Sequence, residues 1–122
     1  MFKKLFAVCL LVDDFYKSFD FYKNTLELKV NSNEGKFANL KLGETELAIF
    51  QKSEATAMFQ KKYMKSGGGA VIGFQVKNVE KVCKILEDKG IKVFEGPKKT
   101  AWGQTVAYFN DPDNNIWEVS EK

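Results

Sequence analysis

The sequence of 122 residues contains no histidine. This absence excludes Ser-His-Asp and Cys-His catalysis, histidine-ligated zinc and acid–base chemistry by an imidazole. Only two cysteines are present, Cys9 and Cys83, and each lies in a segment with periodic apolar residues. Two such distant cysteines cannot form a zinc site. We therefore expect both to be small, reduced core residues of a cytoplasmic protein.

Long hydrophobic runs and strong net charge are also absent. The apolar run from Leu5 to Val12 follows two lysines, as in a signal peptide, but it is short and ends at Asp13-Asp14. We expect it to be a buried first strand, and no other run is long enough to span a membrane. The net charge is only +3, with the lysines spread along the chain, so nothing indicates nucleic-acid binding.

What the chain does contain is an internal repeat. Its 44% of hydrophobic residues and its length suit one folded domain. An apolar strand ending at Val12 precedes an amphipathic helix over 14–26, which Asp14 caps. Val76 and Asn78 repeat this arrangement in the second half, and Gly90 is placed to end the second helix. The other predicted strands are 28–30, 37–42, 45–51, 70–76, 91–94, 104–109 and 116–119.

The segments between these elements suggest where the two halves meet. Residues 54–65 predict a weak helix, with Ala55, Met58, Phe59 and Lys62 at helical spacing. Ser66-Gly67-Gly68-Gly69 then predicts a flexible joint, and it lacks the pattern of a phosphate loop. The chain is therefore predicted to be a single domain of two tandem modules, approximately 1–53 and 70–122. Asn31 to Gly35 predicts a turn, and Gly96-Pro97 predicts a break between strands.

The last predicted strand contains one carboxylate, Glu118, among apolar residues. Residues 111–115 predict a turn before it, and they echo the start of a calcium loop without that loop's glycine and final glutamate. Strand alternation puts Ile116 and Glu118 on one face, and Trp117 and Val119 on the other. The pattern favours an edge strand with Glu118 in water. The alternative is a buried carboxylate that has a partner or takes a proton.

The order of these features resembles the vicinal-oxygen-chelate superfamily, which includes glyoxalases, extradiol dioxygenases, and fosfomycin- and bleomycin-resistance proteins. The resemblance rests on the repeated βαβββ unit and on three motifs: Asp20-Phe21-Tyr22-Lys23 with Leu26, Trp102-Gly103, and Asp111-Pro112-Asp113-Asn114. It implies an α+β fold in which two βαβββ modules form a curved mixed sheet around a concave groove, with the helices outside. It also implies a homodimer.

Enzymes of this superfamily usually bind a divalent metal through residues of the first, fourth, fifth and eighth strands. The flanking motifs place these four positions at Ala7, Ala48, Val71 and Glu118. Alanine and valine carry no donor atom, and a single carboxylate does not hold a divalent ion against water. Glu46 could substitute only if the register moved by two residues. We therefore expect no metal in the groove and no other cofactor.

Three interpretations of function remain open. The favoured one is a metal-free protein, similar to the bleomycin-resistance proteins, that binds an apolar or aromatic small molecule. The residues expected to bind this ligand are Trp102, Tyr108, Phe50, Phe37, Glu118 and Gln75. The aromatic residues among them could equally be ordinary core packing.

The second interpretation is a metal-independent lyase or isomerase. Glu118 would act as the general base, and Tyr108 or a lysine would stabilise the oxyanion. The third interpretation is a non-catalytic scaffold whose groove is closed, with Ala7, Ala48 and Val71 packed against one another. Whether the two modules pair within one chain or swap between chains also stays open.

Overall fold

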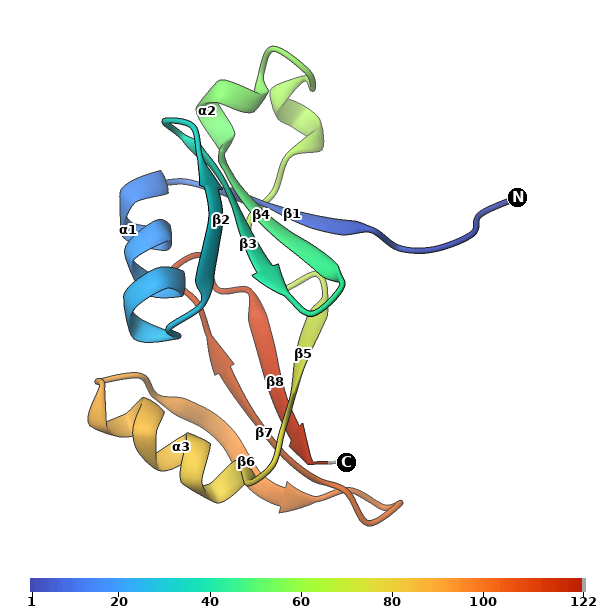
Figure 1. Cartoon of the computed structure of the whole chain (residues 1–122), viewed down its shortest axis with the longest axis vertical. Coiled ribbons are helices and arrows are strands. Elements are labelled where there is room, and N and C mark those ends of the chain that lie inside the picture. Colours follow the sequence, from blue (N-terminus) through green and yellow to red (C-terminus); the bar gives the residue numbers. More distant parts are fainter. Residues whose placement is uncertain (122) are drawn as a thin grey trace. The chain divides into compact units, whose positions relative to one another are not determined.

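The computed structural model describes residues 1–121, which form two compact units, Met1–Ser66 and the chain from Gly67 onward (Figure 1). Each unit contains a strand, a helix and three further strands, in that order. The prediction of an α+β fold with two βαβββ modules is therefore confirmed. Within the described residues, no helix has the length and apolar character needed to cross a membrane.

The first unit is a four-stranded mixed sheet in the order β1-β4-β3-β2, in which β1 and β4 are parallel. Its strands are β1 (Ala7–Val12), β2 (Lys29–Asn33), β3 (Phe37–Leu42) and β4 (Thr45–Gln51). Helix α1 (Phe15–Asp20) continues as a π-helix over Phe21–Thr25, which completes the helix predicted for 14–26. Alternate strand residues such as Leu40 and Ile49 are fully buried and form the core with α1.

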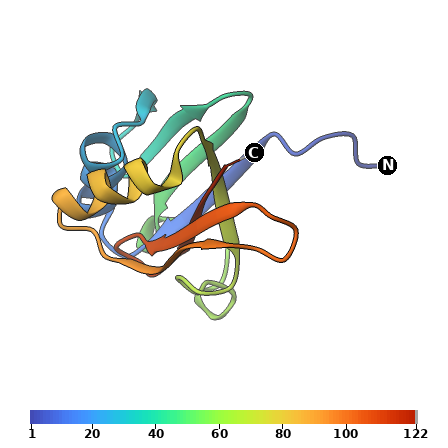
Figure 2. The ribbon, with the colours of Figure 1, turned by 90° about the horizontal axis from the view of Figure 1, so that it is seen from below.

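The second unit repeats this plan in the order β5-β8-β7-β6, with β5 and β8 parallel. Its strands are β5 (Val71–Val76), β6 (Val93–Lys99), β7 (Thr105–Asn110) and β8 (Ile116–Glu121). Helix α3 (Val79–Asp88) packs on β6, β7 and β8, and Figure 2 shows it along one side of these strands. The core of this unit includes Phe109 and Trp117, and the ring of Phe74 stacks on Trp117 at 4.6 Å.

Several predictions about local structure are wrong. Residues 54–65 do not form one helix: α2 (Lys52–Ala55) is a single turn, and a short 3-10 helix spans Lys61–Tyr63. Of the predicted stripe only Ala55 is buried, whereas Met58 and Phe59 are exposed, so the segment has no continuous apolar face to stabilise a helix. The turn predicted from Asn31 begins later, because β2 continues to Asn33.

Gly96-Pro97 does not break the chain between strands but lies inside β6. Strand β6 is at the edge of the sheet, where a proline's missing N–H costs no ladder hydrogen bond. The register between β6 and β7 shifts twice around this pair, which marks bulges in the strand. The strand thus absorbs the two breaking residues because only one of its sides is paired.

The first strand begins later than predicted and is buried on one face only. Leu5 and Phe6 are exposed and precede β1. Cys9 points away from the face that carries Leu10 and Val12 and is exposed, so the expectation of a buried core cysteine is wrong there. Cys83, on the apolar stripe of α3, is buried as predicted.

Candidate functional site

The candidate site lies on the face of the second sheet opposite its buried core. The register places three residues side by side on this face: Gly73 in β5, Glu118 in β8 and Tyr108 in β7. Trp117 and Val119 fill the opposite, buried face, as alternation predicts. Strand β8 lies between β5 and β7, so the prediction of an edge strand with Glu118 in water is wrong. Glu118 is half-buried in the middle of the sheet.

Tyr108 and Glu118 form the polar centre of this face. The Tyr108 hydroxyl donates a hydrogen bond to Glu118 Oε2 at 2.6 Å. This bond, together with burial and the negative charges of Glu118 and Glu95, raises the pKa of Tyr108 above its ordinary value. The phenol therefore stays protonated at neutral pH and holds one of the two carboxylate oxygens.

The β5 side of Glu118 is bare because Gly73 has no side chain. A Cβ placed at Gly73 would lie 3.5 Å from Glu118 Oε1, which is an ordinary contact distance. Val71 and Gln75 alternate with Gly73 on the same strand and are exposed. The second carboxylate oxygen thus lies beside an open patch of sheet, where a ligand could approach it.

The turn between β7 and β8 sets the register that brings Tyr108 opposite Glu118. Asp111 Oδ1 accepts hydrogen bonds from the backbone N–H groups of Asp113 at 3.0 Å and Asn115 at 2.8 Å. The side-chain amide of Asn115 donates to Asp111 Oδ2 at 2.8 Å. The carboxylate of this motif therefore organises a turn, which agrees with the prediction of a turn in place of a calcium loop.

Gly67 packs against this turn instead of acting only as a flexible joint. Its φ is +79°, and an added Cβ would collide with the carbonyl oxygen of Asp113. The N–H of the next residue, Gly68, donates to the carbonyl of Asn114 at 3.1 Å. At Gly67 the glycine is thus required by close approach of two backbone segments.

The other predicted ligand-binding residues are distributed over both units. Gln75 shares the sheet face of Glu118, as the register requires. Trp102 lies in the turn between β6 and β7, is 77% exposed, and donates its indole N–H to Gln104 at 3.0 Å. Phe37 and Phe50 contact each other within the first unit, with ring centroids 5.3 Å apart. Their roles in binding stay predictions.

Sequence reasoning did not select Gly73, Glu95 or Lys98. Gly73 carried a usable signal, because a glycine inside an apolar strand often marks a close approach by another group. Lys98 lies with its Nζ 5.9 Å from the centre of the Tyr108 ring and 3.4 Å from Glu95. No sequence signal pointed to these two, since the bulges of β6 decide where its residues meet β7.

The residues at the four metal positions do not fit a metal. Ala7, Ala48 and Val71 offer no donor atom, and one oxygen of Glu118 already accepts the Tyr108 hydroxyl. Glu46, the alternative in the first unit, pairs in register with Lys41. Within residues 1–121, no group of three or more His, Cys, Asp or Glu side chains is arranged to hold a metal ion. We therefore derive no chemical step through a metal.

Comparisons with known proteins give consistent matches over almost the whole chain. The profile of the glyoxalase-like domain family matches residues 5–122. YraH, an uncharacterized protein of Bacillus subtilis (strain 168), is 32% identical over 123 residues, which cover 95% of this chain and 96% of that protein.

Solved structures match as well. The integron cassette protein VCH_CASS1 from the mobile metagenome of V. cholerae has a TM-score of 0.77 and 29% identity, covering 99% of this chain and 96% of that one. A glyoxalase/bleomycin resistance protein/dioxygenase from Nocardioides has a TM-score of 0.84 at 17% identity, covering 99% of this chain and 84% of that one. The latter likeness bears on the fold alone.

Proposed function

The chain belongs to the glyoxalase-like domain family, and on that premise we propose that it is a metal-free protein that binds a small organic molecule. The observation that carries the proposal is the chemistry of the second sheet's face. On this face the metal position Val71 is apolar, and Glu118 Oε2 accepts a hydrogen bond from Tyr108. The other two metal positions, Ala7 and Ala48, belong to the first unit and are also apolar. Such a face lacks metal ligands but retains a polar anchor for a ligand.

The surroundings of Glu118 suggest what kind of molecule would bind. Glu118 Oε1, on the side of Gly73, can accept a hydrogen bond from an N–H or O–H group of a ligand. Val71, which is 57% exposed on the same face, offers an apolar surface next to it. We therefore expect a ligand that combines a hydrogen-bond donor with an apolar or aromatic body.

A thermal-shift screen tests this proposal. The probes are planar aromatic drugs, small oxo-acids, and the divalent ions of zinc, nickel, manganese and magnesium. An organic probe at a hundred times its Kd should add about 2.7 kcal/mol to the free energy of unfolding, a rise of several degrees in Tm. Glu118→Ala should abolish most of this rise, whereas Lys84→Ala, an exposed change on α3, should preserve it.

Two results would overturn the proposal. One is a divalent ion that raises Tm and is bound at about one ion per chain in metal analysis, which would mean that the four metal positions lie elsewhere. The other is an organic probe whose effect on Tm is the same in wild type and Glu118→Ala, which would place binding away from this face.

The hydrogen bond between Tyr108 and Glu118 also favours a second candidate, proton transfer without a metal. Glu118 would take a proton from a carbon next to a carbonyl, and the bonding electrons would move to the carbonyl oxygen to form an enolate. The raised pKa of Tyr108 keeps its hydroxyl protonated. Once Glu118 has taken the proton, this hydroxyl would turn from Glu118 to donate its hydrogen bond to the enolate oxygen. Returning the proton restores the substrate or yields its isomer.

Hydrogen exchange at carbon distinguishes the two candidates. In D2O, small 2-oxo-acids should lose the NMR signals of the protons on carbon 3, next to the ketone, faster with wild-type protein than in buffer alone. Glu118→Gln should remove this acceleration. If a probe binds but its hydrogen exchange is not accelerated, the result would support the small-molecule binder and contradict the proton-transfer enzyme.

A further inference from the structure

A hollow of about 530 Å³ lies in the first unit, at the end of the sheet where β3 begins and β4 ends. The hollow is shallow and open to solvent, and its volume is in the range of small-molecule sites, which is about 300 to 1,000 Å³. Three aromatic and three charged side chains line it, from α1, the β2–β3 turn, β3, β4 and α2: Tyr16, Phe37, Phe50, Glu34, Lys36 and Glu54.

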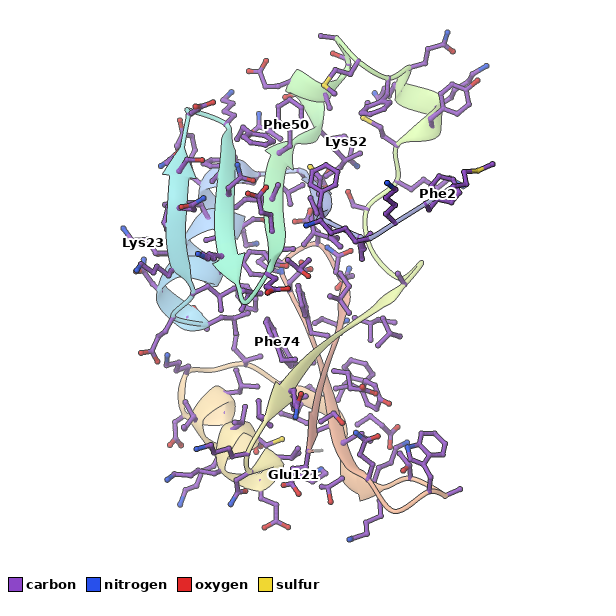
Figure 3. All side chains as sticks on the ribbon, turned by 45° about the vertical axis from the view of Figure 1, so that its right-hand side comes forward. Phe2, Lys23, Phe50, Lys52, Phe74 and Glu121 are labelled. Carbon is purple, nitrogen blue, oxygen red and sulfur yellow. The ribbon has the colours of Figure 1, made fainter. Side chains whose placement is uncertain are left out.

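Two of the aromatic rings form a fixed corner. Phe37 and Phe50 are directly opposite each other in the β3–β4 register, and their ring planes meet at 80° with centroids 5.3 Å apart. Figure 3 shows Phe50 at the end of β4, next to the start of α2. Tyr16, which is 66% exposed, supplies a third ring from α1. The faces of such rings are electron-rich and attract cations.

The charged side chains around the rings are predominantly negative. Glu34 and Glu54 carry two negative charges, and Lys36 carries one positive charge. Lys36 Nζ lies 3.8 Å from Glu54 Oε1, and the two side chains are 41% and 54% exposed. An ion pair that is this exposed is weak, so a cation entering the pocket can replace Lys36 as the partner of Glu54.

We propose that this pocket binds a small organic cation, such as a quaternary or protonated amine. The rings favour a positive charge with attached methyl or methylene groups, which a hydrated metal ion lacks. The carboxylates oppose an anion and give no advantage to a neutral aromatic molecule. All of the lining residues belong to the first unit, so the proposal does not depend on Glu118 or on the function proposed for it.

The first test compares two probes of nearly identical shape. Choline carries a quaternary ammonium group, and 3,3-dimethyl-1-butanol replaces its nitrogen with a neutral carbon. In a two-dimensional amide NMR titration of the full chain, choline should shift the signals of residues 34–37 and 50–54 and bind about tenfold more tightly than the neutral probe. Equal binding of the two probes, or choline shifts outside these segments, would overturn the proposal.

Substitutions that change charge without changing packing give the second test. Lys36→Gln should tighten choline binding about threefold because it removes a competing cation, and Glu54→Gln should weaken it by a similar factor. Glu80→Gln, an exposed change on α3 of the second unit, is the matched control, and it should leave choline binding unchanged. Lys36 and Glu54 are half-exposed or exposed, so the fold should tolerate Lys36→Gln and Glu54→Gln. Weaker choline binding in Lys36→Gln would contradict the proposal.

Discussion

The two modules share the contacts that attach each helix to its sheet. Asp14 Oδ1 accepts the N–H of Lys17 at 3.2 Å, and Asn78 Oδ1 accepts the N–H of Lys81 at 3.0 Å. The first N–H of each helix also donates to a side chain at the end of that sheet's parallel partner strand. This side chain is Gln51 in the first module and Glu121, labelled in Figure 3, in the second.

The modules differ on the sheet face opposite the helix. At the middle of this face, each module places one residue from each of three neighbouring strands side by side. The triplet is Cys9, Ala48 and Asn39 in the first module, and Gly73, Glu118 and Tyr108 in the second. The first triplet is small and uncharged, whereas the second contains a carboxylate held by a phenol. The helix contacts maintain the fold, so this face can vary in chemistry.

Placing a glutamate at the centre of the first face should have the largest effect. Ala48 is 4% exposed, and its register partners are Cys9 and Asn39, neither of which carries a positive charge. Ala48→Glu should therefore lower the free energy of unfolding by about 3 kcal/mol or more in urea titrations. Glu118→Ala, the reverse change in the second module, should cost only about 1 kcal/mol, because Glu118 is half-buried. If Ala48→Glu and Glu118→Ala lower the free energy of unfolding equally, the two faces do not differ in how they accommodate a carboxylate.

Substitutions in the turns of the β3–β4 and β7–β8 hairpins should also lower stability by different amounts. A tight turn at Gly43-Glu44 joins β3 to β4, whereas the longer turn from Asp111 to Asn115 joins β7 to β8. Asp111→Ala removes the acceptor for two backbone amides and one side-chain amide, and should cost about 2 kcal/mol in the same measurement. Glu44→Ala, at an exposed position, should change stability by less than about 0.5 kcal/mol. Similar losses would mean that Asp111 does not organise its turn.

Much of the framework could be predicted because its signals are local. Asp14 and Asn78 each precede a stripe of apolar residues at helical spacing, and both cap a helix as predicted. The helix predicted over 54–65 does not form as one helix. Apolar residues have the same helical spacing there, but Met58 and Phe59 stay exposed because no sheet covers them. Helical periodicity predicts a helix only when tertiary packing covers its apolar side.

The candidate site was harder to predict because it depends on which strands are neighbours. Glu118 was selected from its strand, but its hydrogen bond to Tyr108 follows from the β7–β8 register. The order of strands also makes β8 central, which alternation within one strand cannot indicate. Gly73 became significant only once β5 was seen beside β8.

Removing the Tyr108 hydroxyl should have a smaller effect that depends on pH. Tyr108→Phe should lower the free energy of unfolding by about 1 kcal/mol at pH 7, because the hydrogen bond to Glu118 is lost. The pKa of Tyr108 is raised in the folded chain, so this contribution is complete below the unfolded value of about 10. It is lost as the pH rises through the higher folded value. The difference between wild type and Tyr108→Phe should therefore shrink above about pH 10.

Urea titrations of both proteins from neutral to alkaline pH measure this difference directly. Tyr16→Phe is the control in the first module, because Tyr16 is exposed and its substitution should change little at any pH. A constant difference between wild type and Tyr108→Phe across this range would show that the hydrogen bond does not persist in solution.

The smallest change, Gly73→Ala, separates stability from binding on the second face. The added Cβ would lie 3.5 Å from Glu118 Oε1, without a clash. Alanine also has less conformational freedom than glycine in the unfolded chain, so less entropy is lost on folding. The free energy of unfolding should rise by about 0.5 kcal/mol. Organic probes that depend on Glu118 should nevertheless bind more weakly, because the methyl group narrows the approach to Oε1. Cys9→Ala, at the equivalent position of the first module, should leave probe binding unchanged. If Gly73→Ala leaves probe binding intact, the ligand does not approach Glu118 from the β5 side.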